Sequence, residues 1–105
     1  MPGMNRDDVI AALRAHETEL RLIGVASLSL IGSMARGDDS EKSDVDVVVS
    51  VSDQIKRRGF AYFGHLDKLS QQLESILGRT VDIIVEPVQS DRLRRQIEKE
   101  RIVAF

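Results

Sequence analysis

Apolar residues recur every three or four positions in three segments of the chain, which is the spacing of an amphipathic helix. The first segment covers residues 5–23, where Asn5 can cap the helix and Gly24 supplies a natural stop. The other two segments cover residues 61–77 and 89–100. The pattern therefore predicts three helices.

Three shorter segments carry β-branched and apolar residues in the manner of strands. They are residues 26–31, residues 44–51 with a valine-rich body, and residues 80–85, which Pro87 closes because proline cannot donate to a strand ladder. The predicted order is helix, strand, strand, helix, strand, helix. We therefore expect an α+β (α/β two-layer) fold, with a small mixed sheet of about three strands packed against helices, in a single domain over residues 1–105.

The composition describes a globular domain and excludes several classes of function. The 105 residues are 42% hydrophobic and 30% charged, with a formal net charge of -2, so no basic field favours direct nucleic-acid binding. The lack of cysteine excludes a disulfide framework and thiol catalysis. No apolar run approaches the ~18 residues of a membrane span, and the N-terminus does not have the form of a signal peptide. We expect a cytoplasmic protein that does not bind membranes.

The polar residues that stand out within the predicted strands are aspartates. Side chains alternate along a strand, so Asp44 and Asp46 should share a face, about 6.6 Å apart, while the valines between and after them point into the core. Asp82 lies between two apolar residues of the third strand, although aspartate is a poor strand former. Two like charges ~4 Å apart cost on the order of 4 kcal/mol at an effective dielectric constant near 20.

A divalent cation would remove this repulsion. Oxygen ligands without histidine or cysteine favour Mg²⁺, which commonly takes substrate phosphates as further ligands. Two such ions can clamp the attacking and leaving oxygens of a phosphoryl or nucleotidyl transfer. The three aspartates are therefore candidate metal ligands and catalytic residues.

Gly32 and Ser33 follow the first predicted strand directly, where exposed backbone N–H groups can hold a phosphate. Glycine lets the backbone approach the anion closely, and the serine hydroxyl adds a donor. Arg36 lies one turn further on and can place its guanidinium on a phosphate oxygen. An ion pair between Arg36 and Asp38 or Asp39 is the alternative.

Each of these features also has an ordinary structural interpretation. Gly-Ser after a strand is usually a turn, an Asp-x-Asp pair at a strand start is often solvated charge, and Asp82 can be a satisfied buried carboxylate or a surface residue. Their combination in consecutive strands is much less common by chance. The combination therefore favours a nucleotide site.

Two runs of this sequence resemble the minimal nucleotidyltransferases of the DNA polymerase β superfamily. Residues 30–37 read Leu-Ile-Gly-Ser-Met-Ala-Arg-Gly, and residues 43–49 read Ser-Asp-Val-Asp-Val-Val-Val. The family signature is Gly-Ser-x-Ala-Arg-Gly, a short spacer, and Ser-Asp-x-Asp followed by apolar residues. Residues 81–85 look like the family's third carboxylate strand, and residues 97–102 resemble its terminal segment. The resemblance covers nearly the whole chain.

The resemblance implies roles for individual residues. Asp44 and Asp46 would ligate two magnesium ions, and Asp82 would complete one metal site and orient or deprotonate an acceptor hydroxyl. Gly32 and Ser33 would hold the β- and γ-phosphates of ATP, with Arg36 as a secondary phosphate contact. The hydroxyl would attack the α-phosphate, and pyrophosphate would leave.

The same resemblance implies a biological setting. Single-domain members of this size resemble the MntA-type antitoxins of toxin–antitoxin pairs. Their partner is a helical HEPN-type ribonuclease, on which the antitoxin can adenylylate a tyrosine. Two alternatives remain: a binding module that masks the toxin by contact, and a small-molecule nucleotidyltransferase of the aminoglycoside-modifying type. Members of that last group usually carry an additional helical domain.

Three other clusters have less specific interpretations. Residues 56–58, Lys-Arg-Arg, favour a solvated loop over a nucleic-acid patch. Arg92, Arg94 and Arg95 on the last predicted helix favour a solvated face, with an acidic partner as the alternative. The apolar tail at residues 102–105 favours core packing over a partner contact.

Overall fold

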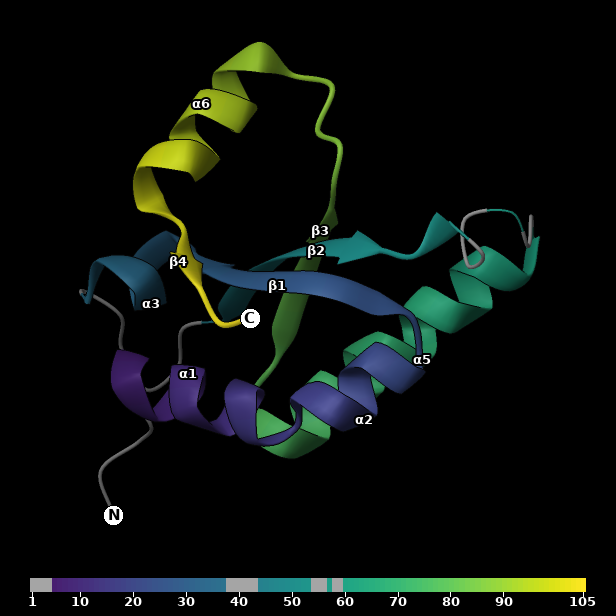
Figure 1. Cartoon of the computed structure of the whole chain (residues 1–105). Helices are drawn as coiled ribbons and strands as arrows, with labels where there is room; N and C mark the ends of the chain where they lie inside the picture. Colours follow the sequence, from purple (N-terminus) through teal and green to yellow (C-terminus); the bar gives the residue numbers. More distant parts are fainter. Residues whose placement is uncertain (1–4, 38–43, 54–56, 58–59) are drawn as a thin grey trace.

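The computed structural model describes residues 5–37, 44–53, 57 and 60–105. Five helices and four strands lie in the described residues, and together they confirm the α+β class (Figure 1). In chain order they are α1 (Arg6–Ala15), α2 (Glu17–Leu22), β1 (Val25–Ile31), α3 (Gly32–Arg36), β2 (Val45–Val51), α5 (Phe60–Leu77), β3 (Val81–Val85), α6 (Asp91–Glu100) and β4 (Ile102–Val103).

The strands form one mixed sheet in the order β3-β2-β1-β4. β1 is antiparallel to both β2 and β4, whereas β2 and β3 are parallel. A parallel pair needs a crossover connection, and α5 lies in the segment that joins β2 to β3. The three predicted strands all form, each within one residue of its predicted bounds.

The fourth strand was not predicted from the sequence. β4 has only two residues, which is too short to show an alternating pattern, and it forms because the chain turns out of α6 at Arg101 and runs back along β1. Its register sets Val103 opposite Ser29, and the pairing continues beyond β4 through hydrogen bonds between Leu28 and both Ala104 and Phe105. Ala104 is buried, so core packing of the tail is confirmed there, while Val103 is 54% exposed.

The predicted single helix over residues 5–23 is wrong in one respect, because it breaks at His16 into α1 and α2. The backbone N–H of His16 bonds the carbonyl of Leu13 at 3.2 Å, which is a tightened turn. The carbonyl of Ala12, which would accept the His16 N–H in a continuous helix, is hydrogen-bonded to the ring Nδ1 of His16 at 2.9 Å. A side chain thus replaces one helical backbone bond, and α2 restarts with a bond from Leu20 N–H to the His16 carbonyl.

The two faces of the sheet carry different layers, as Figure 1 shows. On one face α1, α2 and α5 pack against the alternate valines of β2, which are buried as the sequence predicts. On the other face α6 packs through Ile97 onto Ile31 and Val48, with Ile84 and Val88 beside them. This second, smaller layer leaves room at the α3 end of the sheet. The main core contains Val9, Leu13, Leu20, Leu28, Leu30, Val45, Val47, Val49, Leu69 and Leu73.

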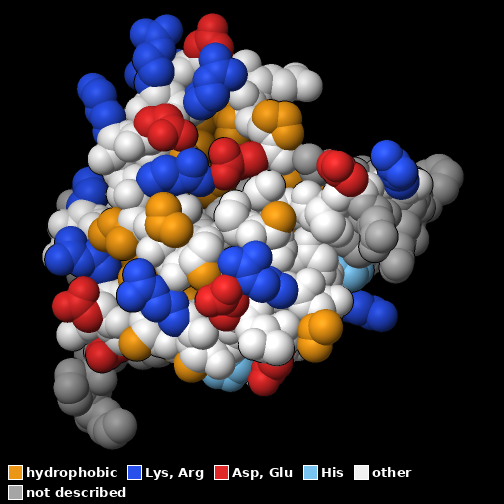
Figure 2. All heavy atoms as spheres, in the orientation of Figure 1, with side chains coloured by type: hydrophobic (Ala, Val, Ile, Leu, Met, Phe, Trp, Pro, Cys, Tyr) orange, Lys and Arg blue, Asp and Glu red, His pale blue; other side chains and the backbone are white. Residues whose placement is uncertain are grey.

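Much of the polar surface matches the expectation from the sequence. Arg92, Arg94 and Arg95 are exposed on α6, and Figure 2 shows basic side chains gathered over this helix. Of the Lys-Arg-Arg cluster, only Arg57 is described, and it is exposed. None of the helices in the described part of the chain combines the length and apolarity needed to cross a bilayer.

Candidate active site

The site begins where β1 ends and α3 starts. Gly32 has a positive φ of 75°, and in the β1–β2 register its neighbour Ile31 lies opposite Asp46. A Cβ at residue 32 would overlap Oδ2 of Asp46 and would lie 3.3 Å from its Cβ. Two features therefore require glycine at this position: the left-handed turn and the close approach of the backbone to a carboxylate.

Two of the three aspartates face each other across neighbouring strands. Asp46 of β2 is the register partner of Asp82 of β3, so their side chains share a face. Partial burial raises the pKa of Asp46, and so do the charges of Asp82 and Asp44 and a hydrogen bond with the Asp82 carboxyl. The Arg36 guanidinium opposes this shift. Asp44 itself is exposed and immediately precedes β2.

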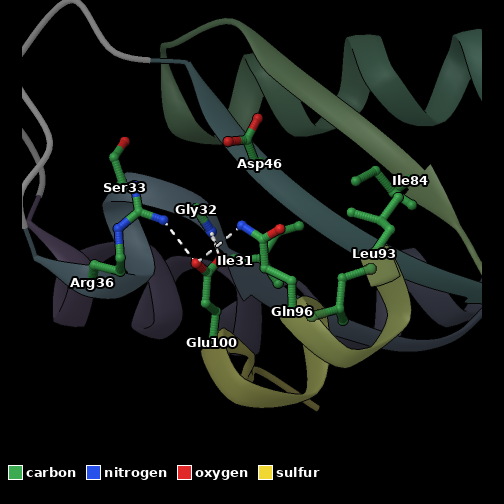
Figure 3. A pocket seen from close by; sticks show the side chains of 10 residues that line it. Ile31, Gly32, Ser33, Arg36, Asp46, Ile84, Leu93, Gln96 and Glu100 are labelled. Carbon is green, nitrogen blue, oxygen red and sulfur yellow. Dashed lines mark hydrogen bonds and ion pairs between the residues drawn. The ribbon is translucent and has the colours of Figure 1, made fainter. Parts of the chain in front are cut away.

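A pocket of about 400 Å³ opens beside this pair, between α3, the sheet and α6 (Figure 3). Figure 3 shows Ser33 and Arg36 on one side of the pocket and Ile84 and Leu93 on the other, so it has a polar end and an apolar end. Such a division suits a ligand with an ionic part and a flat or apolar part. The lining residues are Ile31, Gly32, Ser33, Arg36, Asp46, Ile84, Leu93, Gln96, Ile97 and Glu100.

Arg36 forms an ion pair with Glu100, at the end of α6. Nη1 of Arg36 donates to Oε1 of Glu100 at 2.9 Å, and the Gly32 N–H donates to Oε2 at 3.4 Å. Partial burial raises the pKa of Glu100, but the hydrogen bonds from Arg36, Gln96 and Gly32 outweigh it, so the net pKa lies below its usual range. The alternative partners considered for Arg36, residues 38 and 39, lie outside the described residues.

The structure brings most of the candidate residues together. Gly32, Ser33, Arg36 and Asp46 line one pocket, and Asp82 adjoins it through Asp46. Within the described residues, no group of three or more His, Cys, Asp or Glu side chains is arranged to hold a metal ion, although the charge of Asp44 acts on Asp46.

The contribution of α6 to the pocket was missed. Gln96 and Glu100 are 64 and 68 residues from Gly32 in the sequence, and no local pattern connects them with it. Glu100 belongs to an ordinary run of charged residues near the chain end. Only the docking of α6 through Ile97 places both side chains at the site.

The paired carboxylates suit a divalent cation. Asp46 and Asp82 are carboxyl groups in direct contact. The raised pKa of Asp46 means that its ionised form is disfavoured beside Asp82. A hard cation with oxygen ligands would remove that cost, and both residues offer oxygen only. The donor set therefore fits Mg²⁺.

The sequence matches the family model described as "Nucleotidyltransferase domain" over residues 13–104, which takes in every strand and the whole pocket. The chain belongs to this nucleotidyltransferase family. The matched region carries the Gly32-Ser33 turn and all three aspartates. In this nucleotidyltransferase, the Gly32-Ser33 turn lies at the polar end of the pocket, and the Asp46–Asp82 pair lies beside it.

Two archaeal proteins are similar to this nucleotidyltransferase over most of their length. A Methanocaldococcus jannaschii protein named as a candidate protein adenylyltransferase, MJ1379, is 33% identical over 92 residues, which cover 86% of this chain and 88% of the relative. The protein adenylyltransferase MntA of Thermococcus cleftensis is 28% identical over 101 residues, covering 95% of this chain and 96% of the relative.

Solved structures share the same fold. A structure described as a candidate minimal nucleotidyltransferase superposes with a TM-score of 0.75 at 30% identity, covering 94% of this nucleotidyltransferase and 95% of that chain. A structure described as tri-AMPylated Shewanella oneidensis HEPN toxin in complex with MNT antitoxin contains a chain with a TM-score of 0.60 at 19% identity, covering 91% of this chain and 71% of that one. The second likeness is one of fold.

Proposed function

We propose that this nucleotidyltransferase is a Mg-ATP-dependent protein adenylyltransferase, with residues 1–105 acting as one minimal domain. The observation that carries the proposal is the contact between the Gly32 turn and Asp46, which sets backbone donors for phosphate directly beside a carboxylate pair. The names of the two archaeal relatives support adenylyl transfer as the reaction.

The polar end of the pocket would receive the β- and γ-phosphates of ATP. The turn at Gly32 and the hydroxyl of Ser33 supply hydrogen-bond donors, and Arg36 supplies a charge-assisted bond. Positive φ at Gly32 leaves no Cβ between the backbone and the anion. These groups would hold the triphosphate in one orientation, which reduces the entropy that the reaction must otherwise lose.

The carboxylates would act at the α-phosphate. Asp44, Asp46 and Asp82 would hold Mg²⁺, which when bound neutralises charge on the phosphates and on the leaving pyrophosphate. Asp82 is exposed, so an acceptor hydroxyl can reach it from solvent. Its carboxylate would orient that hydroxyl and accept its proton as the oxygen bonds to the α-phosphorus and pyrophosphate departs.

The acceptor in this proposal is a hydroxyl on a HEPN-type toxin, which this protein would neutralise as its antitoxin. The fold shared with the antitoxin–toxin complex supports that setting. The pocket is open and Asp82 is exposed, so a partner protein would provide the acceptor surface.

A transfer assay tests the function. ATP radiolabelled at the α-phosphate is incubated with the protein, magnesium and lysate from the native host. Label is expected on a small protein, and Asp82→Asn should abolish it. Asp67→Asn is the matched control, because Asp67 is an exposed aspartate on α5 outside the site. This variant should transfer as much label to the small protein as the wild type does.

The outcomes separate the proposed enzyme from its alternatives. Label on a small molecule instead of a protein would indicate a small-molecule nucleotidyltransferase. Mg-ATP binding without any labelled product would indicate a module that masks the toxin by contact. Failure of Asp44→Asn/Asp46→Asn to weaken Mg-ATP binding would contradict the site assignment itself.

A further inference from the structure

Glu100 connects the last helix to the phosphate end of the pocket. Its side chain is 19% exposed and accepts hydrogen bonds from the guanidinium of Arg36 at 2.9 Å and from the Gly32 N–H at 3.4 Å (Figure 3). The bond to Arg36 has the length of a strong charge-assisted bond, while the bond to Gly32 is longer than is usual. Arg36 is therefore the main group on which Glu100 acts.

The two partners of this ion pair differ in how firmly the fold holds them. Glu100 ends α6 one turn after the buried Ile97, and the next residue, Arg101, pairs with Glu86 at 2.7 Å and Glu98 at 3.2 Å. Arg36 ends a five-residue helix, and its side chain is 47% exposed. An arginine side chain in that position has much rotamer entropy to lose when it is ordered. The ion pair with Glu100 thus restrains the partly exposed side chain of Arg36.

We propose that Glu100 is a positioning residue of the nucleotide site, which holds Arg36 at the phosphate end of the pocket without touching the nucleotide. The inference rests on the proposed function, because it takes Arg36 to be a phosphate contact. A guanidinium has five N–H donors, so it can bind a carboxylate and a phosphate oxygen at the same time. Prior restraint by Glu100 means that less entropy is lost when the phosphate arrives.

If Glu100 competed with the nucleotide, its removal would change nucleotide affinity in the opposite direction. A carboxylate beside donors that also receive phosphate could compete with the nucleotide, and its removal would then tighten binding. The geometry favours positioning, because Glu100 makes its firm bond to a group that can bind two anions and only a long bond to the Gly32 backbone donor. Nucleotide affinity distinguishes the two roles directly.

A double-mutant cycle on the dissociation constant of Mg-ATP tests the proposal. Arg36→Ala and Glu100→Ala should each weaken binding by about tenfold, the scale of one charge-assisted hydrogen bond. The double variant should bind no more weakly than Arg36→Ala, because Glu100 acts through Arg36. Glu100→Gln keeps an acceptor in place and should recover part of the loss; it also replaces the alanine variant if that does not fold.

The matched control is Asp91→Ala, on the same helix with an exposed ion pair to Arg94, and it should leave the dissociation constant unchanged. Tighter binding by the Glu100 variants, unchanged binding, or additive losses in the double variant would overturn the proposal. If the wild type does not bind Mg-ATP, the proposed function fails and this inference fails with it. Wild-type binding that Asp46→Asn abolishes but Glu100→Ala leaves intact would overturn only the role of Glu100.

Discussion

At residue 32 two separate constraints fall on one backbone position. The left-handed φ of 75° disfavours any side chain, and the space that a Cβ would need is filled by the Asp46 carboxylate. Gly37 offers a comparison, because its φ of 80° is similar but nothing lies within 4 Å of its Cβ position. The pair allows backbone strain and displacement of the carboxylate to be measured separately.

We predict that Gly32→Ala abolishes detectable Mg-ATP binding and lowers the free energy of unfolding by about 2–3 kcal/mol, from left-handed strain plus the overlap with Asp46. Gly37→Ala should cost only about 1–2 kcal/mol, because only the strain remains. Denaturant unfolding and titration with Mg-ATP measure the two effects. Equal losses of stability and equal nucleotide affinity in both variants would show that the contact with Asp46 has no consequence.

A second residue-scale prediction concerns the charge of Asp46. Because its pKa is raised in the folded protein, the stability gained from its protonation is complete below the ordinary pKa of aspartate and is lost as the pH rises through the raised value. Near pH 7 without metal, Asp46→Asn should therefore raise the melting temperature, by roughly 2–5 °C. The advantage should disappear in acid.

Calorimetry in the presence of a chelator gives the melting temperatures, and a second series with Mg²⁺ is the control. Magnesium should stabilise the wild type and leave Asp46→Asn unchanged, because the variant loses a ligand. A variant that melts below the wild type without metal at pH 7 would mean that the Asp46–Asp82 contact is not a net cost.

Among the elements, α6 contributes to the pocket in a way that the sequence pattern does not predict. Its pattern predicts an amphipathic helix, and that helix forms with Ser90 as its N-cap. Its apolar stripe is narrow, however, with Ile97 as its buried residue, and Leu93 is left at the pocket. Ile97 is the residue of α6 that is buried against the sheet, and the ion pair of Glu100 with Arg36 is expected to contribute to the docking of this helix.

This contribution should depend on pH. Because the net pKa of Glu100 is lowered, the stability it provides is complete above the ordinary pKa of glutamate and is lost as the pH falls through the lowered value. We predict that Glu100→Gln lowers the melting temperature by roughly 1–3 °C at pH 7, since partly exposed ion pairs contribute little. The difference from the wild type should be constant from neutral pH to about pH 5 and shrink below it. A difference that grows in acid would contradict the assignment.

Sequence periodicity predicts the elements that have long buried stripes. It does not predict an element whose existence or end depends on a single contact. α5 and the three longer strands were predicted almost to the residue, because each repeats one pattern over five or more positions. The break at His16 depends on one ring–carbonyl bond, and β4 depends on a pairing between segments more than 70 residues apart. The site divides in the same way: the two local motifs were predictable, but the contacts of Glu100 with Gly32 and Arg36 were not.

For the molecule as a whole, the tail after α6 closes one side of the sheet. β4 pairs with β1, the Arg14 side chain donates to the Ala104 carbonyl at 2.8 Å, and the Arg21 guanidinium lies 5.0 Å from the centre of the Phe105 ring. Without these residues the backbone of β1 would present unpaired N–H and C=O groups, which recruit strands from other chains.

We predict that deletion of residues 102–105 lowers the melting temperature by at least 5 °C and causes concentration-dependent self-association. Val103→Lys is the control, because this side chain is exposed and the backbone pairing is kept, so it should remain as monodisperse as the wild type. Light scattering over a range of concentrations distinguishes the two. A deletion variant that stays stable and monodisperse would show that β4 does not protect the edge.

The proposed role of Glu100 at the pocket also has a kinetic consequence. The Gly32 turn and its α6 partner are separated by 68 residues, so closing that contact requires a long loop to be ordered first. On the ribosome the chain emerges from its N-terminus, and the strand pair β1–β2 can form before α6 has emerged. Under the proposed role of Glu100, tight binding of a nucleotide is therefore acquired only once α6 has docked on the sheet.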